Sequence, residues 1–294
     1  MIRLATRASA LALAQARHVA SLLGAEVELV TVTTSGDQRR LVGDKSRWVK
    51  EIEEALLDGR ADLAVHSAKD VPGELPDGLA IVGVPARADA RDALCGAAAS
   101  LDELPEGAVV GTSALRRRAQ LLAARPDLDV RDVRGNVDTR LGKLAGGEYD
   151  ALVLAMAGLE RLGRPGAGSP LPVDVFTPAP GQGCLAIEAR ADDAQARELA
   201  ASITDRAALT ALTAERALVA ALDATCDTPV AAYAQPLDGQ EGLFVRAFAG
   251  MPDGSSWVRD ALEADGGDPA SVGRAVAERM LSAGAGELLV AAAT

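Results

Sequence analysis

The chain has 294 residues, 49% of them hydrophobic and 24% charged, and this composition excludes a disordered or a collagen-like protein. Forty-two acidic residues against 30 basic ones give a formal net charge of −12, so we do not expect general nucleic-acid binding. Aromatic residues are only 2% of the chain, too few for the stacking surfaces that hold single-stranded nucleic acid. No stretch approaches the roughly 18 apolar residues that span a bilayer, and Arg3 and Arg7 interrupt the apolar region that a secretion signal would need. The sequence therefore predicts a cytoplasmic protein of two or three domains.

The cysteines and histidines are too few and too far apart for a disulfide framework or a zinc site. Cys95, Cys184 and Cys226 form no C-x-x-C pair, and the only histidines are His18 and His66. We therefore predict no metal site, and we expect both histidines either to be structural or to support neighbouring residues of a site without touching the ligand.

Strands and helices are expected to alternate through the first 67 residues. The expected elements are, in order, a strand at 2–7, a helix at 10–24 capped by Ser9, a strand at 25–36, a helix at 46–59 and a buried strand at 61–67. This alternation predicts a parallel sheet with helices on both of its faces.

The same alternation restarts after a loop expected at 86–96. We expect strands at 107–113, 127–135 and 149–158, separated by helices at 114–126 and 136–147. A stretch rich in Pro and Gly at 170–183 marks a boundary, and the strand expected at 184–193 returns to the first sheet. The fold class is therefore α/β, with two similar lobes.

The character of the sequence changes after about residue 202. A helical segment at 215–224 is followed by three antiparallel strands at 229–237, 243–251 and 257–264, and by a closing helix at 268–284. This pattern predicts a small C-terminal α+β domain with a three-stranded antiparallel sheet. The expected domains are residues 1–88 with 184–202, residues 89–183, and residues 203–294.

Cations recur at the points where predicted strands end and helices begin. Ligands of open α/β sheets bind beyond the carboxyl ends of the strands. A helix N-terminus already carries partial positive charge, so a cation there costs roughly a few tenths of a kcal/mol unless an anion compensates it. Taken singly, each of these cations could equally be a solvated surface residue. They are Arg7, Lys69, Arg116, Arg117, Arg134, Arg140 and Arg161.

The repeated pattern predicts a small ligand that bears several carboxylates or phosphates. The hydroxyls of Ser9, Thr112 and Ser113 would add hydrogen-bond donors at the same strand ends. The chain contains neither a Walker sequence nor a dinucleotide-binding G-x-G-x-x-G, which disfavours nucleotides. A ligand with several carboxylates fits better.

Two further residues are candidates for chemistry. Asp70 lies beside Lys69 at a strand end, where an ionised carboxylate can stabilise positive charge that develops in a reaction, although a turn-capping aspartate would look the same. Cys226 lies in a polar loop and is better placed for nucleophilic attack than Cys95 or Cys184, which we expect to be buried. The residues alone leave open whether Cys226 is a nucleophile or a packing thiol.

Several segments resemble the porphobilinogen deaminases, also called hydroxymethylbilane synthases. The resemblance covers most of the first 234 residues in family order, and the remainder matches only in general pattern. The matching segments are IRLATRASALALAQA, VTTSGDQ, WVKEIEEALLDGRADLAVHSAKDVP, GTSALRRRAQLLAARPDLDVRDVRGNVDTRLGKL, YDALVLAMAGLERLG, PAPGQGCLAIEAR and ERALVAALDATCDTPVAAYA.

The resemblance implies two lobes like those of periplasmic binding proteins, with the active site in the cleft between them. It implies a transferase of tetrapyrrole (porphyrin and haem) biosynthesis. Such an enzyme condenses four porphobilinogens head to tail with loss of ammonia, then hydrolyses the product to a linear hydroxymethylbilane. It also implies a dipyrromethane cofactor, made from two porphobilinogens and attached to Cys226 by a thioether. Asp70 takes the place of the catalytic aspartate of the H-S-x-K-D-V-P motif.

The resemblance further implies which residues hold the cofactor and the substrate. Each pyrrole carries an acetate and a propionate, so a growing chain gains two carboxylates per ring, which a cationic cleft would neutralise. The residues at the family's binding positions are Arg7, Ser9, Lys45, Ser67, Lys69, Thr112, Ser113, Arg116, Arg117, Arg134, Asn136, Arg140, Arg161 and Gln182.

The departures from the family pattern lie in two loops. Ala224 and Thr225 precede Cys226 where two glycines are usual, and Ser46 and Trp48 replace a usual glycine and phenylalanine near Lys45. These changes bear on the stiffness and closure of the loops rather than on the chemistry.

Two other functions remain open from the sequence. A non-catalytic solute-binding protein would use the same two lobes but would need neither Asp70 nor Cys226. A reactive-thiol enzyme without a pyrrole cofactor would need a Cys–His pair, which the sequence does not suggest. For the deaminase we expect porphobilinogen as the ligand, no nucleic acid and no membrane, a monomer, and a transient hand-off of the product to uroporphyrinogen-III synthase.

Overall fold

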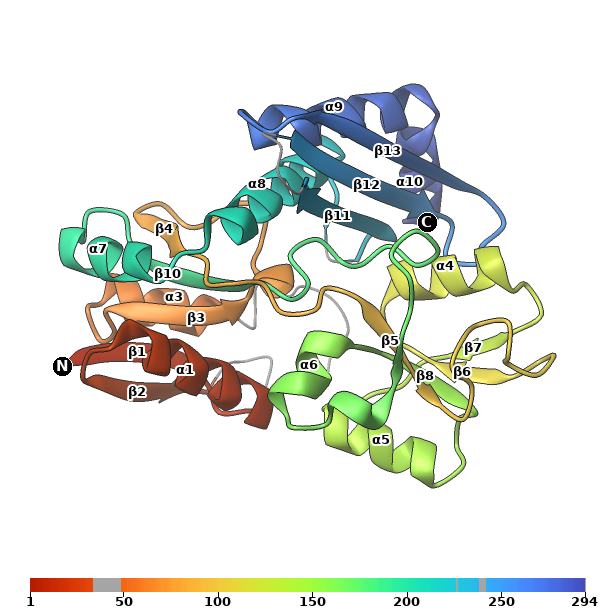
Figure 1. Cartoon of the computed structure of the whole chain (residues 1–294), viewed down its shortest axis with the longest axis horizontal. Coiled ribbons are helices and arrows are strands. Elements are labelled where there is room, and N and C mark those ends of the chain that lie inside the picture. The colour runs from red at the N-terminus through yellow and green to blue at the C-terminus, as the bar shows by residue number, and fades with distance from the viewer. Residues whose placement is uncertain (34–48, 226, 238–241, 294) are drawn as a thin grey trace.

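The computed structural model describes residues 1–33, 49–225, 227–237 and 242–293. Three sheets organise this part of the chain (Figure 1). The first two sheets lie side by side, and the third, with its helices, lies across one end of both. Lys45, Ser46, Trp48 and Cys226 fall outside the described residues.

The first sheet is the expected parallel sheet with one reversed strand inserted. Its strand order is β2-β1-β3-β10-β4, and β10 runs antiparallel to both of its neighbours. The prediction that residues 184–193 return to the first sheet is therefore confirmed. The strands are β1 (Ile2–Arg7), β2 (Val27–Val32), β3 (Leu63–Ser67), β4 (Leu79–Gly83) and β10 (Leu185–Arg190).

Helices cover both faces of the first sheet. Buried residues of α1 (Ala10–Leu23) and α7 (Ala194–Ser202) pack on one face, against Leu4 and Ile187. The apolar stripe of α3 (Lys50–Leu57) packs on the other, where Ile52 meets Ala64. This arrangement confirms an α/β lobe.

The second sheet repeats the architecture. Its order is β7-β6-β8-β5-β9, with β6, β7 and β8 parallel and β5 antiparallel to β8. Its strands are β5 (Asp92–Gly96), β6 (Val109–Gly111), β7 (Asp129–Arg131), β8 (Ala151–Ala155) and β9 (Ser169–Pro170). Its helices are α4 (Leu115–Ala124), α5 (Val137–Ala145) and α6 (Met156–Arg161).

The loop expected at 86–96 is wrong in its second half, because residues 92–96 form β5. The apolar run of this strand is short, and it opens on Asp92, whose charge argues against a buried strand. The structure shows why a charge is tolerated there: Asp92 is fully buried but paired with two arginines. Strand β4 was likewise not predicted.

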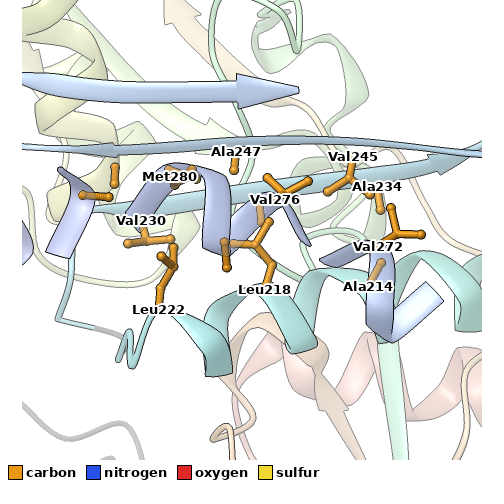
Figure 2. Close-up of a cluster of buried hydrophobic side chains, with 14 of the residues drawn as sticks. Ala214, Leu218, Leu222, Val230, Ala234, Val245, Ala247, Val272, Val276 and Met280 are labelled. Carbon is orange, nitrogen blue, oxygen red and sulfur yellow. The ribbon is translucent and has the colours of Figure 1, made fainter. Parts of the chain in front are cut away.

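The C-terminal part forms the expected α+β unit. Its sheet, in the order β11-β12-β13, is antiparallel throughout and packs one face on helices α8 and α9, as Figure 2 shows for Leu218, Val245 and Val276. The short helix α10 continues beyond the predicted closing helix. The elements are α8 (Arg206–Ala221), β11 (Val230–Pro236), β12 (Gly242–Gly250), β13 (Trp257–Asp265), α9 (Pro269–Ser282) and α10 (Ala285–Ala292).

The predicted fold class, two α/β lobes with a small C-terminal domain, is confirmed by these sheets. The proposed limits at residues 88/89, 183/184 and 202/203 stay a prediction. Two segments, 84–91 and 171–184, connect the first two sheets (Figure 1). Several of the predicted site residues lie where these segments meet the strand ends.

Candidate functional site

Most of the predicted cations lie at or just beyond the carboxyl ends of parallel strands, whereas Arg161 ends helix α6, because β8 stops at Ala155 and not at residue 158 as expected. Arg7 is the last residue of β1, and β3 ends at Ser67, directly before the short 3-10 helix η2 (Ala68–Asp70). In the second sheet, Thr112 follows β6, and Arg134 lies between β7 and α5. Since parallel strands end at the same edge of a sheet, each lobe presents its polar residues along one edge.

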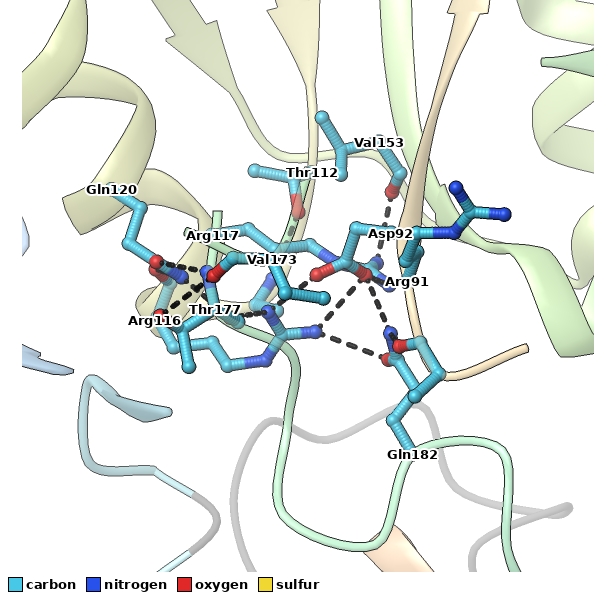
Figure 3. A network of polar contacts seen from close by, with 12 residues as sticks. Arg91, Asp92, Thr112, Arg116, Arg117, Gln120, Val153, Val173, Thr177 and Gln182 are labelled. Carbon is cyan, nitrogen blue, oxygen red and sulfur yellow. Dashed lines mark hydrogen bonds and ion pairs between the residues drawn. The ribbon is translucent and has the colours of Figure 1, made fainter. Parts of the chain in front are cut away.

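A buried carboxylate organises the centre of the site. Asp92 accepts hydrogen bonds from Arg116 at 2.7 and 3.1 Å and from Arg117 at 2.6 and 3.0 Å (Figure 3). The side-chain amide of Gln182 donates to the same carboxylate at 3.0 Å. Burial alone would raise the pKa of Asp92, but the charges of Arg116 and Arg117 hold it far below its usual range. Asp92 therefore fixes both guanidinium groups at the start of α4.

Gln182 connects this cluster to the first lobe. Its amide group donates to the Ala90 carbonyl at 2.7 Å, and its Oε1 accepts from Arg116 at 3.1 Å and from Lys69 Nζ at 3.4 Å. Both lobes thus meet through one fully buried amide. The resemblance assigned Gln182 a polar contact to the ligand, and the structure gives it a second role as a bridge between Lys69 and Arg116.

The position of Lys69 lowers its basicity. Burial, together with the charges of Arg117 and Arg116, lowers the pKa of Lys69 to about 8, although Asp70 and Asp92 act in the opposite direction. An ammonium group in this state gains strongly from an anionic ligand, because the ligand would replace the hydration that burial removes.

Two glycines allow the turn before β10 to approach the first lobe. Gly181 and Gly183 have φ angles of +72° and +88°. A Cβ atom on Gly183 would lie 2.4 Å from the Ala88 carbonyl oxygen, and one on Gly181 would lie 3.0 Å from the backbone of Ala68 and Lys69. The turn therefore requires glycine at both positions, and it places Gln182 between the lobes.

A second buried ion pair ties the C-terminal part to this turn. Glu215 of α8 is fully buried and accepts from Arg87 at 2.7 and 3.2 Å, from the Gly181 amide at 2.5 Å and from the Ala234 amide at 2.7 Å. Arg87 also donates to the Gln182 carbonyl at 2.9 Å. One carboxylate thus joins α8, β11 and both connecting segments.

The other predicted binding residues occupy strand ends and helix N-termini. Ser9 caps α1 and Asn136 caps α5, each accepting from a backbone amide three residues on. Arg140 donates to the Gly135 carbonyl at 2.8 Å and to Ser113 Oγ at 3.4 Å. Arg134 is exposed.

Three more hydrogen bonds involve the predicted residues Arg161, Ser67 and Thr112. Arg161 donates to the Gly183 carbonyl at 2.7 Å, and burial lowers its pKa. Ser67 Oγ accepts from Gln15 at 2.8 Å, and the buried Thr112 Oγ1 accepts from the Ala114 amide at 3.3 Å. The role of each of these residues in ligand binding stays a prediction.

The sequence reasoning missed Asp92, Glu215 and Arg87. Asp92 stands in the charged run ARADARD, where a solvated loop is the simpler interpretation, and Glu215 stands among alanines and leucines in α8. Only Glu215 could have been recognised from the sequence, because a carboxylate on the apolar side of a helix needs a buried cationic or hydrogen-bonding partner.

The cysteines that the structure describes are buried, as predicted. Burial raises the pKa of Cys95 to about 11 and that of Cys184 to about 12, so neither is a ready nucleophile. The described residues also contain no group of three or more His, Cys, Asp or Glu side chains that could hold a metal ion. None of the helices described is long and apolar enough to cross a membrane.

Several solved structures are partly similar to this chain. A lipoprotein of the YaeC family from Enterococcus faecalis is 13% identical, with a TM-score of 0.43, covering 70% of this chain and 91% of that one. A putative periplasmic sulfonate-binding protein from Methylobacillus flagellatus is 17% identical, with a TM-score of 0.38, covering 73% of this chain and 66% of that one. A periplasmic binding protein from Brucella ovis, solved with glutathione bound, is 14% identical, with a TM-score of 0.39, covering 76% of this chain and 69% of that one.

Two family models match nearly the whole chain. The dipyrromethane cofactor-binding domain of porphobilinogen deaminase matches residues 2–198, and the C-terminal domain of porphobilinogen deaminase matches residues 209–282. The first match contains Asp70 and the cluster around Asp92, and the second contains position 226. The chain therefore belongs to the porphobilinogen deaminase family, which acts in tetrapyrrole biosynthesis.

Proposed function

We propose that this protein is a hydroxymethylbilane synthase. It condenses four porphobilinogens head to tail, releases four ammonia molecules and adds one water to free linear hydroxymethylbilane. The observation that carries the proposal is a group of cations shared by the two lobes. Arg116 and Arg117 pair with the buried Asp92, and Lys69 reaches Arg116 through Gln182. The chain that carries this group matches the family over both of its domains.

The charge of this cluster suits a ligand with several carboxylates. Asp92 neutralises only part of the charge of Arg116, Arg117 and Lys69, so the group keeps a positive charge in a protein whose net charge is −12. A growing tetrapyrrole adds two carboxylates with each ring. We propose that further cations of the two lobes receive them, namely Arg7, Arg134, Arg140 and Arg161.

The dipyrromethane fits this cationic surface as a group bearing four carboxylates of its own. When bound, it supplies the nucleophilic pyrrole carbon from which the chain grows. We propose that Lys69, Arg116 and Arg117 hold its carboxylates and that Cys226 anchors it by a thioether. Among the described residues near that cysteine, the Thr228 hydroxyl donates to the Thr225 carbonyl at 2.6 Å.

The position of Asp70 supports the catalytic role that we propose for it. It ends η2, directly after Lys69, and so lies at the edge of the first sheet that faces the arginine cluster. As ammonia leaves porphobilinogen, positive charge develops on the pyrrole. A fixed carboxylate can stabilise that charge and can accept the proton that the attacking pyrrole ring loses.

We further propose that the enzyme works as a cytoplasmic monomer and that its unstable product passes to uroporphyrinogen-III synthase. The test of the function is a turnover assay with porphobilinogen. We expect one ammonia released for each porphobilinogen consumed, and one linear tetrapyrrole for every four. Saturable binding of porphobilinogen without release of ammonia would contradict the proposal and would favour a solute-binding protein.

Lys69 gives the reaction a predicted dependence on pH. With a pKa of about 8, it loses its charge as the pH rises, so kcat/KM for porphobilinogen should fall by up to about tenfold at pH 9. The Lys69→Arg variant keeps its charge and should show a much shallower decrease, whatever its absolute rate.

The comparison is a kcat/KM profile from pH 6.5 to 9.5. The matched control is Lys143→Arg, because Lys143 lies at the surface, 3.7 Å from Glu148, and its replacement should leave the profile of the wild type unchanged. Equal slopes for wild type and Lys69→Arg would show that this amine does not carry the pH dependence.

A further inference from the structure

Three titratable side chains meet under the strand that leads to Asp70. His66 of β3 and Glu188 of β10 are both buried, with His66 Nε2 3.1 Å from Glu188 Oε2. Glu53 of α3 is buried beside them, and its charge interacts with both. None of these residues was assigned a role in the reaction.

The register of the sheet explains why they meet. His66 pairs with Ala186, and Glu188 pairs with Ala64, so the two side chains lie on the same face of the sheet. This is the face that α3 covers through Ile52, and that α8 covers where it packs on Ala186. The three side chains therefore lie between the sheet and its covering helices.

The cluster is short of hydrogen bonds. Neither oxygen of Glu188, nor Oε1 of Glu53, nor Nε2 of His66 has an aligned hydrogen-bond partner among the described residues, although the His66–Glu188 contact is close. A buried carboxylate without donors is unfavourable when it is ionised, and two such carboxylates in one site repel each other. A single proton within the cluster removes much of this cost.

The charged groups around the cluster do not supply that compensation directly. From α8, Arg216 interacts with Glu188 at longer range, but its guanidinium donates to the carbonyls of Pro72 and Gly73, both at 2.8 Å. From α3, the other acidic residues are Glu51, which is half-buried, and Glu54, which is exposed. Burial, reinforced by the charge of Glu188, raises the pKa of Glu53 to about 7.

The cluster is connected through few residues to the turn that carries Lys69 and Asp70. Only Ser67 and η2 separate His66 from Val71, and the Ala68 amide donates to the carbonyl of Cys184 at 3.1 Å, directly before the strand that carries Glu188. Arg216 holds the other end of the same turn. A charge that pushes α3 away from β10 would therefore loosen the end of β3 on which Lys69 and Asp70 depend.

We infer that Glu53, His66 and Glu188 form a proton-binding cluster that positions the turn carrying Lys69 and Asp70, and that loss of its proton loosens this turn. The three residues are positioning residues, since they act through β3. The inference about turnover rests on the proposed function, whereas the inference about the turn does not.

The test compares the wild type with Glu53→Gln, which imitates the protonated side chain. Backbone hydrogen exchange over residues 63–71 is measured at pH 6 and pH 8 and corrected for the intrinsic rates. In the wild type, protection should fall by up to about tenfold at pH 8, because a group with a pKa of about 7 is ionised in about one tenth of the molecules at pH 6 and in about nine tenths at pH 8. In Glu53→Gln the protection should change little. The control is Glu54→Gln, one residue away but exposed, which should behave as the wild type does.

A kinetic measurement distinguishes an effect on the position of Lys69 and Asp70 from an effect on the stability of the fold alone. In the wild type, kcat should fall above pH 7 with little change in KM, and Glu53→Gln should keep its kcat to higher pH. The inference would be overturned if hydrogen exchange in the wild type and in Glu53→Gln depended on pH in the same way. It would also be overturned if both proteins turned over porphobilinogen and their kcat values had the same pH profile. If Glu53→Gln does not fold, Glu188→Gln answers the same question. A wild type that never turns over porphobilinogen would refute the proposed function and leave the exchange result to decide the inference.

Discussion

Replacing Asp70 with asparagine is expected to lower the rate of porphobilinogen turnover by about 10²- to 10⁴-fold without unfolding the protein. Asparagine has nearly the shape of aspartate, so η2 and its contacts should survive. It cannot offset positive charge on the pyrrole, and it cannot accept a proton at neutral pH. The variant should therefore still bind the substrate, because Lys69, Arg116 and Arg117 are untouched.

The measurement is ammonia release in a single turnover, with the fold checked by circular dichroism. Asp77→Asn is the matched control, since Asp77 is exposed in the loop that follows η2. Loss of the same carboxylate charge at that position should leave the rate unchanged. If Asp70→Asn turns over as fast as Asp77→Asn, Asp70 is not the catalytic carboxylate.

Replacing Asp92 with asparagine is expected to give the largest loss of stability in the site, about 3–5 kcal/mol. The variant leaves Arg116 and Arg117 buried without the charge that compensates them. In a thermal melt this corresponds to a decrease on the order of 10 °C. Binding of carboxylated ligands should suffer as well, because the two guanidinium groups lose the partner that orients them.

The shifted pKa of Asp92 also predicts how the stability of the wild type changes with pH. The pKa of Asp92 is depressed in the folded protein, so its stabilisation is present above the unfolded-state pKa of about 4 and is lost as the pH falls towards the folded-state value. The wild type should therefore lose stability below about pH 4 by an amount that Asp92→Asn does not show.

Thermal and urea unfolding midpoints at pH 7 and at pH 3.5 check both statements. Asp129→Asn serves as the control, because Asp129 pairs with Arg131 on the surface, where solvent screens the charges and little change is expected. Equal midpoints for Asp92→Asn and Asp129→Asn at pH 7 would show that the buried cluster is not a stabilising unit.

Much of the fold follows from local patterns. Apolar strands such as LAVHS, separated by amphipathic helices, predict the two lobes, and the Pro- and Gly-rich stretch at 170–183 predicts the return to the first sheet. The pattern fails at β5, because Asp92 looks solvated until Arg116 and Arg117 are placed beside it by the fold. Burial of a charge depends on a partner that is distant in sequence, and a single sequence does not show the partner.

The sequence predicted that cations gather at strand ends, but it did not predict the contacts between them. The positions of Lys69, Arg116 and Arg117 at strand ends follow from the alternation of strands and helices. The sequence could not show that Gln182 links Lys69 to Arg116, because that contact depends on two glycine turns and on a close approach of the lobes. The anchoring role of Cys226 and the part played by Lys45 stay predictions.

The intact mass of the purified, denatured protein tests the central claim most directly. We predict an excess over the sequence mass equal to two porphobilinogens less two ammonias in the wild type and in Cys95→Ala, and no excess in Cys226→Ser. An apoprotein would start unmodified and gain this mass on incubation with porphobilinogen. A wild-type mass that stays unmodified after that incubation, or an excess that persists in Cys226→Ser, would contradict the covalent dipyrromethane on which the account rests.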